Sequence, residues 1–179
     1  MEELVKKSKE GNEEAFTELI ITIESELYKI ARMRLECNDD INEAVQETII
    51  QAFKSIKKLR KPQYFKTWII RILINNCNKI YKKLKRNNIL DNLEVNNVHS
   101  IYNEEEEINR LDFFILINSL SYKERISLTL YYLEDLTTKE ISKIVKEPES
   151  TIRNRISRAV IKLKKIYEKE DVANEWYRI

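Results

Sequence analysis

The sequence predicts an all-α protein in which two helical bundles are joined by a flexible acidic linker, the second bundle containing a helix-turn-helix. Its 179 residues suffice for one large domain or two small ones. The chain has one Gly and two Pro, whereas β-sheet proteins contain many such residues in their hairpin turns. Hydrophobic residues make up 42% of the chain and charged residues 35%, which suits a core beneath a heavily charged surface.

Apolar residues recur at helical spacing through the first half of the chain. Between residues 2 and 34 they predict a short helix, a break at Gly11-Asn12 and one longer helix. Residues 38–40 are expected to cap the next helix, which Pro62 ends because proline disfavours helix at the residue before it. The apolar face of that helix is predicted to be Ile41, Val45, Thr48, Ala52 and Ile56. A further helix is expected over 63–86, with Phe65, Trp68, Ile69, Ile72, Leu73 and Ile80 buried.

The helical periodicity is lost between residues 87 and 107, a stretch rich in Asn and Glu. We interpret it as a flexible acidic linker. Beyond it, four helices are predicted over 108–120, 122–132, 138–146 and 150–168. The predicted organisation is a first domain over 1–86, the linker over 87–107, a second domain over 108–168 and a tail over 169–179.

Charge is segregated along the chain. Residues 57–86 carry 11 Lys or Arg and no acidic residue, and residues 137–179 have a net charge of +4. The segment between them, 87–136, has a net charge of −7. A solvated face normally interleaves both signs, although a basic helix that aids solubility is an alternative. Two basic segments favour two contacts with one long polyanion such as DNA, because Lys and Arg on phosphates release counterions.

Little in the sequence points to catalysis or metal binding. Cys37, Cys77 and His99 stand singly, whereas a structural zinc site needs about four Cys or His ligands at short spacing. With no phosphate-binding loop or catalytic pair, we expect no enzymatic activity, no catalytic residues, no cofactor and no metal. The sequence shows no signal peptide and no apolar run of about 18 residues, so a cytoplasmic protein without membrane insertion is predicted.

Residues 137–166 carry a helix-turn-helix pattern. Thr137 or Thr138 is expected to cap a short first helix, and Ser150 the second. The inward stripe of the second helix is predicted to be Ile152, Ile156, Val160 and Leu163. Its outward face presents Arg and Asn, which read guanine and adenine by paired hydrogen bonds, although a plain basic hairpin is the alternative. The candidate DNA-contacting residues are Ser150, Thr151, Arg153, Asn154, Arg155, Ser157, Arg158 and Lys162.

Two further segments carry a specific resemblance. The run Asp-Ile-Asn-Glu-Ala-Val-Gln-Glu-Thr over residues 40–48, followed by Tyr-Phe-Lys-Thr-Trp-Ile-Ile-Arg-Ile over 64–72, resembles region 2 of bacterial extracytoplasmic-function (group 4) RNA polymerase sigma factors. Residues 116–163 resemble region 4 of the same family. The resemblance implies an alternative sigma factor that binds core RNA polymerase and directs promoter-specific initiation by recognising −10 and −35 elements.

The resemblance also implies roles for particular residues. Glu43, Gln46 and Glu47 fall at i, i+3 and i+4 and so share one polar patch. The residues implied to bind the clamp helices of the largest polymerase subunit are Asp40, Glu43, Gln46 and Glu47. Those implied to contact the −10 element are Arg60, Lys61, Gln63, Tyr64, Lys66, Arg71, Asn75, Asn76, Lys79 and Lys82. Residues 150–162 would contact the −35 element, and the protein would also meet the flap of the second-largest polymerase subunit.

The resemblance implies an anti-sigma factor, often membrane-bound, that holds the protein inactive. The competing hypothesis is a helix-turn-helix regulator that acts without being a polymerase subunit. Such a regulator would require a palindromic site and DNA binding in the absence of polymerase.

Overall fold

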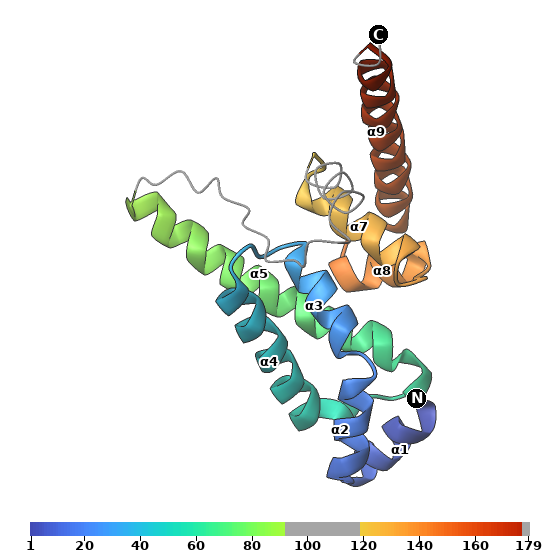
Figure 1. Ribbon diagram of the computed structural model, residues 1–179. Helices are drawn as coiled ribbons and strands as arrows, with labels where there is room; N and C mark the ends of the chain where they lie inside the picture. Colours follow the sequence, from blue (N-terminus) through green and yellow to red (C-terminus); the bar gives the residue numbers. More distant parts are fainter. Residues whose placement is uncertain (92–118, 177–179) are drawn as a thin grey trace. The chain divides into compact units, whose positions relative to one another are not determined.

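The prediction of an all-α protein is confirmed by a computed structural model that describes residues 1–91 and 119–176, with side chains over 1–86 and 119–166. Every regular element among the described residues is a helix (Figure 1). The chain divides into two compact units, Met1–Asn96 and Asn97–Ile179. The predicted linker from residue 92 onward, and the predicted helix over 108–120 except for its last two residues, lie outside the described residues. The predicted domain boundaries therefore stay a prediction.

The break between the first two helices lies where the sequence predicts it. Helix α1 (Glu2–Glu10) ends at Gly11, whose φ of 101° is a left-handed conformation that glycine adopts without strain. Asn12 then caps α2 (Glu13–Ile21), its side-chain oxygen accepting a hydrogen bond from the Ala15 N–H at 2.7 Å.

The prediction of one long second helix is wrong. Helix α2 ends at Ile21 and α3 (Glu24–Arg32) starts after a short irregular step. The Thr22 hydroxyl donates to the Leu19 carbonyl at 2.7 Å, a local bond that competes with helix continuation. Ile23 is completely buried at φ −121°, so the step directs this side chain into the core.

Helices α4 (Asn38–Ser55) and α5 (Phe65–Asp91) pack along one another and form the centre of the first unit (Figure 1). The short 3-10 helices η1 (Ile56–Lys58) and η2 (Pro62–Tyr64) connect them. The predicted apolar face of α4 and its extension is confirmed, with Ile41, Val45, Thr48, Ala52 and Ile56 all buried. On α5 the buried residues are Phe65, Ile69, Ile70, Leu73, Ile74, Asn76, Cys77 and Ile80, while Trp68 and Ile72 are half-buried.

Two details of these helices differ from the prediction. Residues 38–40 do not cap α4, because the helix already begins at Asn38 and its N-cap is Cys37 in an extended conformation. Asp39 and Asp40 instead lie in the first turn, where carboxylates favour the positive end of the helix dipole. Helix α5 runs to Asp91, so residues 87–91 of the predicted linker are helical.

The second unit contains α7 (Tyr122–Tyr132), α8 (Thr138–Val145) and α9 (Glu149–Trp176). The bounds of α7 match the prediction, and Ser121 and Glu124 form a capping box at its start. Thr137 and Glu140 form the same arrangement on α8, whereas Thr138 is the first helical residue. Helix α8 ends at Lys146, which takes a left-handed conformation with φ 59°.

Helix α9 departs from the prediction at both ends and on one face. It begins at Glu149, one residue before the expected cap Ser150, and the Pro148 carbonyl accepts the hydrogen bond from the Ile152 N–H. It continues to Trp176, so most of the predicted tail is helical. Val160 was predicted to be buried but is 39% exposed, because the completely buried Ala159 continues the stripe instead. The buried core of the unit includes Ile126, Leu130, Ile141, Ile144, Ile152, Ile156 and Ala159.

Candidate functional site

Helix α4 presents an acidic patch, which we define as Asp40, Glu43, Gln46 and Glu47. Asp40 is half-buried and the other three side chains are exposed. Partial desolvation, followed by repulsion from Glu43 and Asp39, raises the pKa of Asp40 above 3.8. Carboxylates crowded in this way favour a partner that brings positive charge.

The acidic patch continues into two exposed apolar residues that the sequence analysis did not single out. Ile50 is 46% exposed and Phe53 is 49% exposed. Phe53 and Phe16 make an edge-type ring contact with centroids 5.2 Å apart, which fixes the Phe53 ring on the surface. Gln46, Ile50 and Phe53 recur at helical spacing off the buried stripe, and this pattern was the signal available in the sequence.

Nine of the ten residues implied to meet the −10 element lie on the surface of the first unit. Arg60, Lys61, Gln63 and Tyr64 are exposed on the connection between α4 and α5, and Lys66 is half-buried at the start of α5. The exposed residues Arg71, Asn75, Lys79 and Lys82 follow one side of α5. We call these four residues the basic stripe.

Asn76 is the exception, because it is only 2% exposed. Its side-chain amide donates to the Thr48 hydroxyl at 3.1 Å and accepts from Gln51 at 3.3 Å. The prediction of an exposed, DNA-facing Asn76 is therefore wrong. The sequence places it beside the exposed Asn75, and a helix turns by about 100° between neighbours, so only one of the pair faces outward.

Trp68 lies half-buried against Phe65, with ring centroids 5.9 Å apart. The predicted burial of Trp68 is therefore only partly met, because the ring packs against the buried Phe65 but is itself half-buried.

The outward face of α9 carries the residues predicted to read DNA. Ser150, Thr151, Arg153, Asn154, Ser157, Arg158 and Lys162 are all exposed. Glu149 accepts hydrogen bonds from the Thr138 hydroxyl at 2.8 Å and from Arg153 at 3.1 Å, and these lower its pKa. The carboxylate thereby ties the start of α9 to the start of α8 and orients Arg153.

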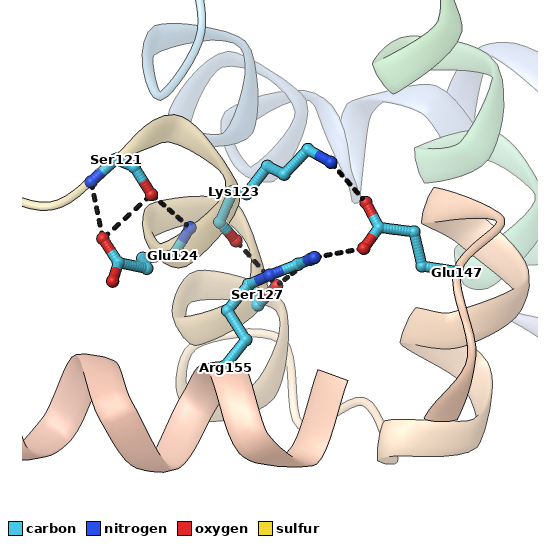
Figure 2. A network of polar contacts seen from close by, with 6 residues as sticks. All are labelled: Ser121, Lys123, Glu124, Ser127, Glu147 and Arg155. Carbon is cyan, nitrogen blue, oxygen red and sulfur yellow. Dashed lines mark hydrogen bonds and ion pairs between the residues drawn. The ribbon is translucent and has the colours of Figure 1, made fainter. Parts of the chain in front are cut away.

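Arg155 belongs to a different set of contacts, shown in Figure 2. Its side chain is only 12% exposed and is paired with Glu147 in the turn between α8 and α9. It also donates to the Ser127 hydroxyl on α7 at 3.3 Å, while Lys123 pairs with Glu147 at 3.0 Å. This guanidinium therefore holds the turn against α7 instead of lying on the exposed face with the other candidate residues, and its contact with DNA stays a prediction.

The charge state of Glu147 follows from the same contacts. Partial burial opposes ionisation, but hydrogen bonds and charge from Arg155 and Lys123 outweigh it and lower the pKa of Glu147 below 4.5. The carboxylate is thus held ionised between two cations. A second ion pair, Lys162 with Glu124 at 3.6 Å, joins α9 to the capping box of α7.

No three His, Cys, Asp or Glu side chains within the described residues gather closely enough to hold a metal ion. Among those residues there is also no helix long and apolar enough to cross a bilayer.

Comparison with known proteins gives two family matches and relatives that align over most of the chain. Residues 19–87 match sigma-70 region 2 and residues 116–163 match sigma-70 region 4. The chain is 30% identical to the ECF RNA polymerase sigma-E factor of Escherichia coli K12 over 172 residues, covering 87% of this chain and 88% of the relative. It is 25% identical to RNA polymerase sigma factor SigV of Bacillus subtilis, covering 93% of this chain and 99% of the relative.

Two solved structures have a similar fold. The sigma factor RpoE of Bartonella quintana, in complex with the anti-sigma factor NepR, aligns with a TM-score of 0.72 at 20% identity, covering 86% of this chain and 96% of that one. CnrH in complex with the cytosolic domain of CnrY aligns with a TM-score of 0.69 at 18% identity, covering 94% of this chain and 97% of that one.

The Glu147 ion pair makes stability depend on pH. Glu147→Gln should lower the free energy of unfolding by about 1–3 kcal/mol near pH 7, because Arg155 loses its counter-charge while still largely buried. A lowered pKa in the folded state means that this stabilisation is fully present above pH 4.5 and is lost as the pH falls through the folded-state value. Urea unfolding followed by circular dichroism at neutral and acid pH measures the difference.

Lys123→Gln is the graded control, since it removes only the outer and more exposed partner of Glu147. It should cost less than Glu147→Gln at neutral pH. An equal loss for Glu147→Gln at neutral and acid pH would show that the ion pair does not hold the turn.

Proposed function

The chain belongs to the extracytoplasmic-function RNA polymerase sigma factors, which direct transcription initiation, and from that membership we propose which surface serves which partner. The acidic patch of α4 binds the clamp helices of the largest subunit of core RNA polymerase. The second unit meets the flap of the second-largest subunit. The protein works in the cytoplasm as a non-catalytic subunit, and the polymerase makes the covalent bonds.

The proposal that the acidic patch binds polymerase rests on the exposure of its side chains. Glu43, Gln46 and Glu47 lie off the buried stripe of α4, so packing of the first unit does not require their head groups. A cluster of carboxylates and an amide suits a basic and polar partner. The adjacent Ile50 and Phe53 give the same surface an apolar end, which adds contact area that excludes water.

DNA is assigned to the two basic surfaces. The connection from Arg60 to Tyr64 and the basic stripe of α5 contact the −10 element, where exposed Lys and Arg meet phosphates and the exposed Tyr64 meets bases. The start of α9 enters the major groove of the −35 element. Asn154 and Arg158 there reach base edges, and the lysines further along contact phosphates.

An anti-sigma factor is the third proposed partner. The proteins of similar fold include a sigma factor solved with an anti-sigma factor. We propose a separate, membrane-bound inhibitor that covers the polymerase-binding and DNA-binding surfaces. The exposed apolar residues Ile50 and Phe53 provide it with a contact that polymerase would otherwise occupy.

Removing the acidic patch tests polymerase binding. The combined variant Glu43→Ala, Gln46→Ala, Glu47→Ala should weaken binding to core RNA polymerase at least about tenfold, with helicity unchanged, because these side chains are exposed. Equilibrium titration of core enzyme measures it. The matched control is Glu14→Ala with Glu18→Ala, which removes two exposed carboxylates from α2. Equal affinities for the patch variant and this control would contradict the assignment.

Substitutions on α9 should distinguish residues that contact bases from residues that contact phosphates. Asn154→Ala and Arg158→Ala should each cost about 1–3 kcal/mol and relax preference at one or two −35 positions. Lys165→Ala should lower affinity for all sequences and reduce the salt slope by about one unit. Selection from a randomised −35 library by the polymerase holoenzyme distinguishes the two effects. A uniform loss for all three variants, with the consensus unchanged, would place the readout elsewhere.

A further inference from the structure

A polar chain runs from the buried face of α5 to the acidic patch of α4. The Thr48 hydroxyl donates to the Ala44 carbonyl at 2.7 Å and accepts from the Asn76 amide at 3.1 Å. The Asn76 oxygen accepts from the Gln51 amide at 3.3 Å, and the same Gln51 amide donates to the Glu47 carboxylate at 2.7 Å. Each bond pairs a donor with an acceptor. These hydrogen bonds therefore determine the orientation of the Asn76 and Gln51 side-chain amides.

From this chain we infer that Asn76 is a positioning residue for polymerase binding: through Gln51 it holds the Glu47 carboxylate in the orientation that core RNA polymerase meets. The inference rests on the proposed function, since Glu47 belongs to the acidic patch. It assigns to α5 a part in polymerase binding, in addition to the DNA contacts of its basic stripe.

The buried side-chain amide of Asn76 requires an explanation in terms of function. Asn76 is 2% exposed, whereas the other buried residues of α5 between 65 and 86 are apolar or Cys, such as Leu73 and Ile80. A buried amide destabilises the fold unless its hydrogen bonds are satisfied, and an apolar residue carries no such requirement. Here the hydrogen bonds are satisfied, and the chain they form ends at an exposed carboxylate rather than within the core.

The gain from this arrangement is pre-organisation. A Glu on an exposed helix face samples several rotamers and loses that freedom when it binds a partner. Glu47 already accepts a hydrogen bond from Gln51, whose second amide hydrogen is held by Asn76. Ordering one such side chain before binding corresponds to an affinity gain of about two- to tenfold.

A double-mutant cycle on the full-length protein tests the inference. Asn76→Ala should weaken binding to core RNA polymerase about two- to tenfold when Glu47 is present, and should have no further effect in the Glu47→Ala background. Gln51→Ala breaks the middle of the chain at a half-exposed position and should give the same coupling with Glu47. This variant keeps the test available if Asn76→Ala fails to fold.

Thr48→Val is the matched control. It removes the other hydrogen bond of the Asn76 amide group but leaves the bonds from Asn76 through Gln51 to Glu47 in place. It should lower the unfolding midpoint in urea without changing the affinity of the folded protein for polymerase.

Two results would overturn the inference, and they are distinguishable. If Asn76→Ala and Gln51→Ala lower affinity equally with and without Glu47, or lower stability alone, the positioning role is wrong while the acidic patch stands. If Glu47→Ala itself leaves polymerase binding unchanged, this part of the acidic patch is wrong and the positioning role falls with it.

Discussion

The packing of α4 along α5 is the constraint on which the first unit depends. Ile41, Val45 and Ala52 are buried against the rest of the unit, and burying an Ile or Val side chain contributes about 1.5–3 kcal/mol. Rotation of α4 about its axis would expose that stripe, so the remaining positions are held toward solvent. The acidic patch, which we propose binds polymerase, is thus a surface whose orientation is set by the hydrophobic core. The same packing brings Asn76 within reach of Thr48 and Gln51.

In the second unit, the ion pair between Arg155 and Glu147 holds α9, the second helix of the predicted helix-turn-helix, in place. Arg155 and Glu147 join the start of α9 to the preceding turn, and Ser127 and Lys123 join both to α7 (Figure 2). A helix that reads base edges must be held at a fixed angle to the rest of its domain. One arginine of the α9 basic face therefore serves structure, whereas its neighbour Asn154 is exposed and is proposed to contact bases.

Sequence periodicity predicted the helices well where neighbouring residues decide the outcome. The bounds of α7, the Gly11-Asn12 break and the buried stripe of α4 all follow from local spacing, caps and the conformational freedom of glycine. The burial of Asn76 and Arg155 was missed because their partners lie outside their own helices: Gln51 is 25 residues from Asn76, and Glu147 and Ser127 are 8 and 28 residues from Arg155. Polar side chains at the edge of a stripe face inward only if such partners exist, and spacing within one helix carries no information about them.

Run-off transcription tests the central claim most directly, namely that this protein gives core RNA polymerase its promoter choice. Core enzyme would be mixed with this protein on a library of randomised upstream sequences, with core enzyme alone and protein alone as controls. We expect transcripts only from the mixture, starting downstream of two sequence elements at a fixed separation. Selective binding of a palindromic site by the protein alone, with no transcripts from the mixture, would contradict it and identify a regulator that acts without joining the polymerase.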